Sequence, residues 1–148
     1  MQQVIFSVPG KPQGKARAKT YHNHGVTRTV TPEKTVLYEN FIKECFLRES
    51  NGVFFDKGTP VYLIVEIRYA PPKSTSKKRY TGMMEGKEYP TKKPDADNVL
   101  KVICDALNGV AYYDDAQIIY IACGKKYAVN DGLTISLYGM EAGGKNER

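Results

Sequence analysis

The most regular pattern in the chain is the alternation of residues 61–69, VYLIVEIRY, where every second residue from Val61 onward is apolar. A period of two is typical of a β-strand that buries one face. Residues 2–8, QQVIFSV, predict a shorter strand, and the turn signal Pro9-Gly10 follows it. The chain is therefore expected to begin with a strand and to carry its most apolar strand in the middle.

Two further strands are expected near the C-terminus, at residues 117–127 and 132–139. Asn130-Asp131-Gly132 lies at the junction between them, and Asn or Asp before Gly is a strong hairpin signal. We therefore expect these two strands to pair with each other as a hairpin.

A helical spacing begins after Thr31, a good N-cap, and Pro32, which suits the first helical position. The apolar positions then recur at the interval of a helix, at Leu37, Tyr38, Phe41, Ile42 and Cys45. Gly52 is a suitable C-terminal stop, so the first helix is expected to end near Ser50-Asn51-Gly52.

A second helix is expected at residues 97–108, with Gly109 as its stop. Its apolar stripe consists of Leu100, Ile103, Cys104 and Leu107. The segments 10–30 and 70–94 are basic and show no period, so both are expected to be loops. The tail at 141–148 is expected to be flexible.

The expected elements follow one another in the order β-α-β-α-β-β. We predict an α+β fold in which two main helices pack on one face of a small mixed β-sheet. A chain of 148 residues fits one domain, and it contains no internal repeat. Residues 1–148 are therefore expected to form a single domain.

Composition excludes several classes of protein. No apolar run approaches the roughly 18 residues that a membrane span needs, and the N-terminus lacks the basic region of a signal peptide. We expect a cytoplasmic protein without a membrane anchor. The three cysteines, Cys45, Cys104 and Cys123, are far apart and form no CxxC pair, which argues against a zinc site or a redox motif.

Charge is distributed very unevenly along the chain, whose net charge is +6. Residues 1–30 contain five Lys or Arg and no acid, and residues 68–93 contain eight Lys or Arg against two Glu. Residues 94–117 contain five Asp and one Lys. Basic segments attract a polyanion, and an acidic cluster repels it unless cations intervene. This combination favours nucleic acid and a divalent metal as partners.

The five aspartates fall into distinct groups by their spacing. Asp95 and Asp97 form a D-x-D pair at the start of the second predicted helix. Steps of four from Asp97 reach Lys101 and Asp105, so these three residues share a helical face that should point to a cleft or to solvent. The remaining pair, Asp114-Asp115, follows the helix.

Carboxylates in such a cluster can hold Mg²⁺ against a phosphodiester, because hard divalent ions prefer oxygen ligands. A nearby lysine can stabilise negative charge in the transition state. The plainer interpretation is that Asp97 is an N-cap and Asp95 a turn residue. A calcium loop fails, because Val99 and Leu100 occupy the positions that need Asp or Asn and Gly.

Two other interpretations are weaker. A glycosyltransferase-type D-x-D lacks a nucleotide-binding βαβ unit in this short chain. His22-Asn23-His24 spells the letters of the HNH nucleases, but in those enzymes the three residues are spread over a ββα-metal unit and are not contiguous. A basic loop that contains two histidines explains this second motif.

The stretch from Lys93 to Lys101, KPDADNVLK, followed by DALNG at 105–109 and DDAQ at 114–117, resembles the RusA family of Holliday junction resolvases. The resemblance implies a RusA-like fold and a homodimer that makes paired, symmetric nicks in a four-way DNA junction. It also implies Mg²⁺ as the cofactor, with Mn²⁺ as an alternative, and no organic cofactor.

The resemblance also assigns roles to residues. The catalytic, metal-binding carboxylates fall on Asp95, Asp97 and Asp115, and the essential lysine falls on Lys101. Asp105, Asp114 and Asn98 become supporting residues.

Phosphate contacts are expected from the two basic segments, and such contacts position the DNA without specifying its sequence. The candidates are Lys15, Arg17, Lys19, Lys77, Lys78, Arg79, Lys92 and Lys93. Tyr80 or Tyr89 could stack on an opened base. The main rival hypothesis is a branched-DNA-binding recombination factor without catalytic activity.

Overall fold

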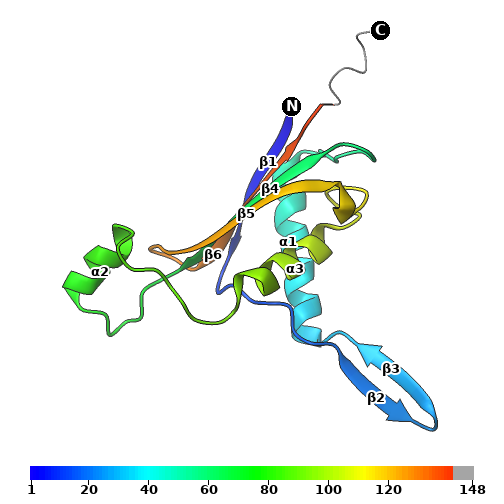
Figure 1. Cartoon of the computed structure of the whole chain (residues 1–148), viewed down its shortest axis with the longest axis horizontal. Coiled ribbons are helices and arrows are strands. Elements are labelled where there is room, and N and C mark those ends of the chain that lie inside the picture. The colour runs from blue at the N-terminus through cyan, green and yellow to red at the C-terminus, as the bar shows by residue number, and fades with distance from the viewer. Residues whose placement is uncertain (142–148) are drawn as a thin grey trace.

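A four-stranded mixed sheet with helices on one face forms the body of the chain in a computed structural model, which describes residues 1–141 (Figure 1). The strands are β1 (Gln2–Pro9), β2 (Lys19–Asn23), β3 (Val26–Val30), β4 (Val61–Tyr69), β5 (Ile118–Tyr127) and β6 (Gly132–Gly139). The helices are α1 (Glu33–Ser50), α2 (Lys77–Met84) and α3 (Ala96–Leu107), and a short 3₁₀ turn covers Asp115–Gln117.

The strands of the main sheet lie in the order β1-β6-β4-β5. β4 is central, and it pairs antiparallel with β6 and parallel with β5. β1 extends the sheet as the antiparallel neighbour of β6. This mixed sheet with its helices on one face confirms the predicted fold class.

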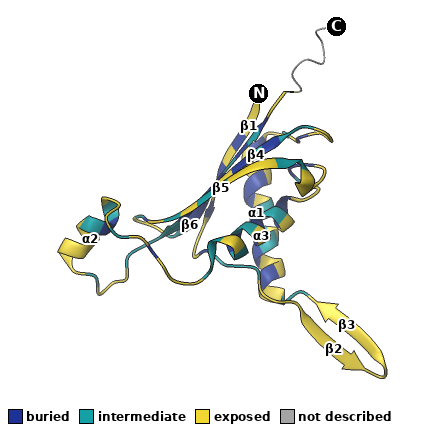
Figure 2. Cartoon of the chain, in the orientation of Figure 1, coloured by how far each residue is buried: buried dark blue, intermediate teal, exposed yellow. Residues whose placement is uncertain are grey.

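One face of the sheet carries the core. The alternation predicted for β4 is observed: Val61, Leu63, Val65 and Ile67 are all buried. They lie beside the buried residues of β1 and β6 under α1 and α3, and the ring of Phe6 meets that of Phe46 of α1 edge-on at 5.6 Å. The opposite face is more open, with Ile5 49% and Ile64 39% exposed (Figure 2).

The predicted hairpin between the two C-terminal strands is wrong. β5 and β6 lie on opposite sides of β4 and do not pair with each other. The connection between them crosses the end of β4, where the Asp131 carboxylate accepts a hydrogen bond from the Ala70 amide at 2.7 Å and the Ala128 amide donates to the Tyr69 carbonyl. The Asn-Asp-Gly signal marks this turn correctly. The two strands that it joins, β5 and β6, each form their hydrogen bonds with the apolar strand β4 and not with each other.

The two predicted loops both contain regular structure. Within residues 10–30, β2 and β3 form a two-stranded antiparallel ribbon around His24 and Gly25, which both have positive φ. Within residues 70–94, the helix α2 begins after Ser76, whose hydroxyl accepts a hydrogen bond from the Arg79 amide. Neither element shows a clear apolar period, because β2 and β3 bury no residue and α2 buries only Met83.

The two main helices match their predicted positions closely. α1 has Pro32, not Thr31, as its N-cap, and it ends at Asn51 in the left-handed conformation. Leu37, predicted on the buried face, is instead 61% exposed. α3 begins and ends within one residue of its predicted bounds, and the predicted stop Gly109 has a φ of +76°.

Two further expectations concern the C-terminal tail and membrane-spanning helices. The tail prediction for 141–148 falls almost entirely outside the described residues. Among residues 1–141, no helix has the length and hydropathy that crossing a bilayer requires.

The close packing of Gly139 on β6 predicts that a larger residue at this position lowers the stability of the fold. A Cβ built there would lie 2.5 Å from Cδ1 of the fully buried Phe55. Gly139→Ala should therefore lower the free energy of unfolding by about 1–3 kcal/mol through overpacking. Gly124→Ala on β5 is the matched control, because a Cβ there meets nothing within 4 Å. Urea unfolding measures both, and equal stability of the two variants would contradict this packing.

Candidate functional site

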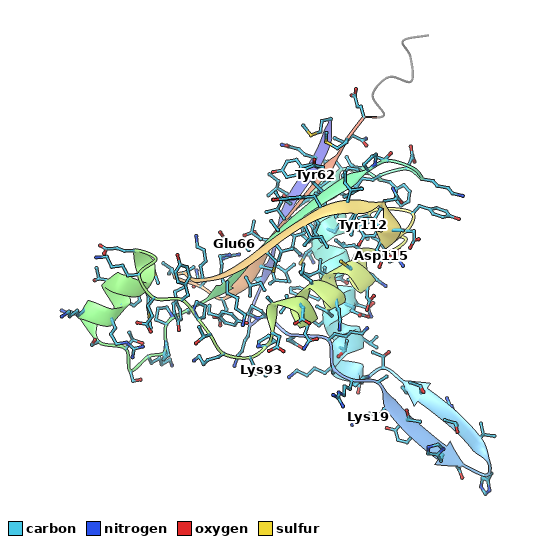
Figure 3. All side chains as sticks on the ribbon, viewed as in Figure 1. Lys19, Tyr62, Glu66, Lys93, Tyr112 and Asp115 are labelled. Carbon is cyan, nitrogen blue, oxygen red and sulfur yellow. The ribbon has the colours of Figure 1, made fainter. Side chains whose placement is uncertain are left out.

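The N-terminal end of α3 presents the first candidate carboxylates. The helix packs one stripe into the core, where Val99, Val102, Ile103, Ala106 and Leu107 are buried. Asp97, Lys101 and Asp105 lie on its exposed face, as their spacing predicted. The packing of α3 therefore fixes where this polar face lies, and the labelled Lys93 and Asp115 mark the two ends of the helix in Figure 3.

Asp95 occupies the N-cap position of α3, but its side chain makes no capping hydrogen bond. Its carboxylate instead accepts a hydrogen bond from the Lys93 ammonium at 2.8 Å. This hydrogen bond holds the pKa of Asp95 below its ordinary value and raises the pKa of Lys93. The plainer interpretation made Asp97 the N-cap and Asp95 a turn residue, and it is wrong about the cap, because Asp95 holds that position.

The N-terminal segment is fixed against this end of α3. The Lys15 amide donates to the Asn98 carbonyl at 2.9 Å. Gly14 approaches so closely that a Cβ there would lie 3.0 Å from the Cβ atoms of both Pro94 and Asn98. Asn98, predicted as a supporting residue, thus holds the chain that leads to the β2–β3 ribbon.

The Lys15 side chain joins three elements. Its ammonium lies 2.8 Å from Glu39 of α1 and 3.0 Å from Asp105 of α3. Burial alone would lower the pKa of Lys15, but the hydrogen bonds to the two carboxylates outweigh it and raise the pKa. Lys15 was predicted to contact phosphate, and the structure places it in an internal ion-pair network that the sequence alone did not reveal.

The turn with Asp114 and Asp115 forms the second group of carboxylates. Asp114 and Gln117 form a capping box, in which the Gln117 side-chain oxygen accepts from the Asp114 amide at 2.9 Å. The Gln117 amide group donates to the carbonyls of Phe55, Asp56 and Thr59 at 3.3, 2.8 and 3.1 Å. Gln117 therefore locks the aspartate turn to the segment before β4, a role that explains the final residue of the DDAQ motif.

Asp115 lies in an acidic environment. Desolvation, a hydrogen bond with Asp114, and the charges of Asp114 and Asp105 raise the pKa of the Asp115 carboxyl. Nearby, the Tyr112 hydroxyl donates to the Cys104 carbonyl at 3.1 Å and ties the turn region to the last turn of α3. Asp115 is thus a neighbour of the C-terminal end of α3.

The two groups of carboxylates lie at opposite ends of α3. Eight residues separate Asp97 from Asp105, which corresponds to about 12 Å of helix at 1.5 Å per residue. Within residues 1–141, no group of three or more His, Cys, Asp or Glu side chains is placed to hold one metal ion. Asp95 and Asp97 fit an ion held by two carboxylates, water and substrate phosphate. Asp115 lies at the other end of α3, where Asp114 and Asp105 are its charged neighbours.

Five of the eight predicted phosphate-contacting residues lie on or beside two projections of the chain. Arg17 and Lys19 lead into the exposed β2–β3 ribbon, and Lys77, Lys78 and Arg79 lie on α2, where Arg79 pairs with Glu88. Lys92 and Lys93 precede α3 and are exposed, and Tyr80 and Tyr89 are 40% and 59% exposed. Figure 1 shows the ribbon and α2 on either side of the start of α3.

Comparisons with known proteins give matches over most of the chain. A family model described as "Endodeoxyribonuclease RusA" matches residues 9–138. A protein of Lactococcus phage r1t, called crossover junction endodeoxyribonuclease rusA, is 33% identical over 131 residues, which cover 88% of this chain and 78% of the relative. The uncharacterized protein YqaN of Bacillus subtilis strain 168 is 28% identical over 130 residues, covering 86% and 90% of the two chains.

The hydrogen bonds of Gln117 predict a loss of stability in Gln117→Leu. Removing the amide takes a donor from the carbonyls of Phe55, Asp56 and Thr59, although that of Asp56 keeps its hydrogen bond from the Thr59 amide at 2.9 Å. The free energy of unfolding should fall by on the order of 2 kcal/mol. Gln3→Leu, at an exposed position of β1, is the control and should change little. Thermal unfolding compares the two, and an unchanged Gln117→Leu midpoint would refute the locking role.

The raised pKa of Asp115 predicts a pH-dependent effect of Asp115→Asn. A carboxyl whose pKa is higher in the folded chain favours folding while protonated, and this contribution is lost as pH rises through the folded pKa. The neutral asparagine should therefore make the variant more stable than the parent protein at pH 7. The difference should shrink as pH falls toward the ordinary value of 3.8. Denaturant unfolding of both proteins between pH 7 and this value measures the difference in their free energies of unfolding. A difference that does not change with pH would count against the acidic environment of Asp115.

Proposed function

Because the chain belongs to the RusA family of endodeoxyribonucleases, we propose that it resolves Holliday junctions and related branched DNA by paired, symmetric nicks in DNA recombination and repair. The observation that carries the proposal is the Asp95–Asp97 pair at the exposed end of α3, with Lys101 one turn further along the helix. Cleavage of a DNA phosphodiester is the activity of the family. The branched substrate and the symmetric cuts are the proposed part.

The proposed reaction depends on Mg²⁺, with Mn²⁺ as an alternative ion. When bound, such an ion lowers the pKa of a coordinated water and neutralises charge at the phosphate. Asp95 and Asp97 are proposed to hold the ion, and Asp115 is proposed as a further ligand in the assembled complex. Lys93 contacts Oδ1 of Asp95, so Oδ2 can take an ion while the exposed ammonium of Lys93 turns to a DNA phosphate.

Lys101 is proposed to stabilise the transition state directly. It lies on the same exposed face of α3 as Asp97, and its ammonium can approach a phosphate that the carboxylate pair positions. A positive charge near the scissile phosphate is more valuable in the transition state, where negative charge develops, than in the ground state. The two basic projections on either side of the site are proposed to hold the duplex arms.

A homodimer is the proposed active form. Resolution of a four-way junction needs two matched cuts, and a two-fold assembly supplies two matched sites. Such an enzyme would act in the cytoplasm of a bacterium or of a phage-infected host. Sedimentation equilibrium measures the assembly, and a chain that remains monomeric on the junction would contradict this part of the proposal.

Asp97→Asn is the direct test of the proposed catalysis. We expect no Mg²⁺-dependent nicking of a synthetic four-way junction, while binding persists or tightens because a charge that repels the DNA is lost. Glu33→Gln removes a carboxylate from the first turn of α1 and serves as the matched control, with nicking retained. A gel assay with Mg²⁺ and with EDTA measures both.

Two results would contradict the proposal. Nicking by Asp97→Asn at the rate of the parent protein would remove Asp97 from the reaction. Junction binding by the parent protein without any Mg²⁺-dependent nick would favour a non-catalytic DNA-binding factor.

A further inference from the structure

The ribbon formed by β2 and β3, residues 19–30, is unusual because it has no share in the core. All ten residues of its two strands are exposed, and within residues 1–141 the strands pair only with each other. The ribbon projects from the body of the molecule beyond the N-terminal end of α1 (Figures 1 and 2). A lone two-stranded hairpin is only marginally stable in water, so a partner that covers it would stabilise it.

The ribbon has a regular and well-defined shape. Its strands pair in register from Lys19 opposite Val30 to Asn23 opposite Val26. His24 and Gly25 have φ values of 50° and 76°, and two consecutive positive φ angles give the turn whose twist matches paired strands. Each strand has five residues, which corresponds to a length of about 17 Å.

The two faces of the ribbon differ in chemistry. On one face, side chains bond across the strands, since the Thr27 hydroxyl lies 3.0 Å from Nδ1 of His22. The other face forms a shallow hollow lined by Tyr21, Asn23, Val26, Arg28 and Val30, and Lys19 lies on the same face. This face combines two cations, an amide and an exposed tyrosine with the exposed side chains of Val26 and Val30, and residues 1–30 contain no acid. Such a surface complements a polyanion.

The base of the ribbon is fixed to the candidate catalytic site. The Lys15 amide is bound to the Asn98 carbonyl, next to the Asp95–Asp97 pair, and the Ala16 amide donates to the Thr35 hydroxyl at 3.4 Å. Lys19 begins the ribbon only four residues after Lys15. DNA held by the ribbon would therefore be held at a defined position relative to the carboxylates.

We propose that the ribbon lies in the major groove of one duplex arm of the substrate, with the face of Lys19, Tyr21 and Arg28 toward the DNA. The major groove, about 12 Å wide, admits a two-stranded ribbon without distortion, whereas the minor groove of about 6 Å must first be widened at a cost in deformation energy. Lys19 and Arg28 contact phosphates or base edges, and the ribbon sets the distance between the gripped groove and the cut. This inference rests on the proposed function, because it takes branched DNA as the substrate.

The experiment compares two double variants that each remove two cations. Lys19→Ala with Arg28→Ala alters the ribbon, and Lys43→Ala with Arg48→Ala alters α1 as the control. Fluorescence anisotropy gives the Kd for a four-way junction at several salt concentrations. The ribbon variant should bind about tenfold more weakly or worse, and the slope of log Kd against log salt should fall by about two. The control should keep the parent values.

A second measurement identifies the groove. Methylation of guanine N7 places a group in the major groove, so methylated sites within one duplex arm should weaken binding by the parent protein. The ribbon variant should no longer respond to this methylation. Because neither strand contributes to the core, both proteins should unfold at the same temperature.

Three results would overturn the inference. The first is an unchanged Kd and salt slope in the ribbon variant, and the second is binding by the parent protein that ignores guanine methylation. The third is conversion of a dimer to a monomer by the variant, which would show that the ribbon grips a second copy of the chain. Neither the Kd nor the effect of methylation requires the DNA to be cut. A failure to nick would therefore count against the proposed function, whereas the binding measurements alone decide this inference.

Discussion

The parallel pairing of β4 and β5 is the constraint on which the rest of the structure depends. Two parallel neighbours cannot be joined by a tight turn, so residues 70–117 must cross the sheet and return to the edge where β4 began. α3 makes this crossing, and its buried stripe fixes the helix on the sheet. As a consequence, the start of α3 and the turn after it come to lie at two ends of one rigid helix. All five aspartates between residues 94 and 117 are placed by this crossing.

The aspartates of residues 94–117 differ in the charges that surround them. Lys15 forms ion pairs with Asp105 and Glu39 and so joins α3 to α1 and to the N-terminal segment. Asp115 remains in an acidic environment that raises its pKa. At the other end, Asp95 pairs with the exposed Lys93 and lies in the field of Lys125, and among the described residues Asp97 and Lys101 form no ion pair. The start of α3 is therefore the place where carboxylates remain available to a cation while basic projections flank them.

Sequence patterns predicted those elements that bury a periodic face. α3, β4 and the exposed Asp97–Lys101–Asp105 face follow directly from spacing, because burial of one stripe forces the opposite stripe outward. The ribbon at 19–30 and the helix α2 were missed because they bury almost nothing. The pairing of β5 with β6 was misjudged because a turn signal is local, whereas the choice of neighbour depends on the whole sheet. The contacts of Lys15 and Gln117 join segments distant in sequence, and no local pattern reveals them.

The central claim is that the Asp95–Asp97 pair at the start of α3 binds the catalytic ion. Direct titration with Mn²⁺, followed by electron paramagnetic resonance of the free ion, measures this binding in the presence of an uncleaved junction. The account predicts that Asp95→Asn and Asp97→Asn each lose the bound ion, whereas Glu33→Gln keeps it. Full Mn²⁺ binding by both of the first two variants would contradict the claim.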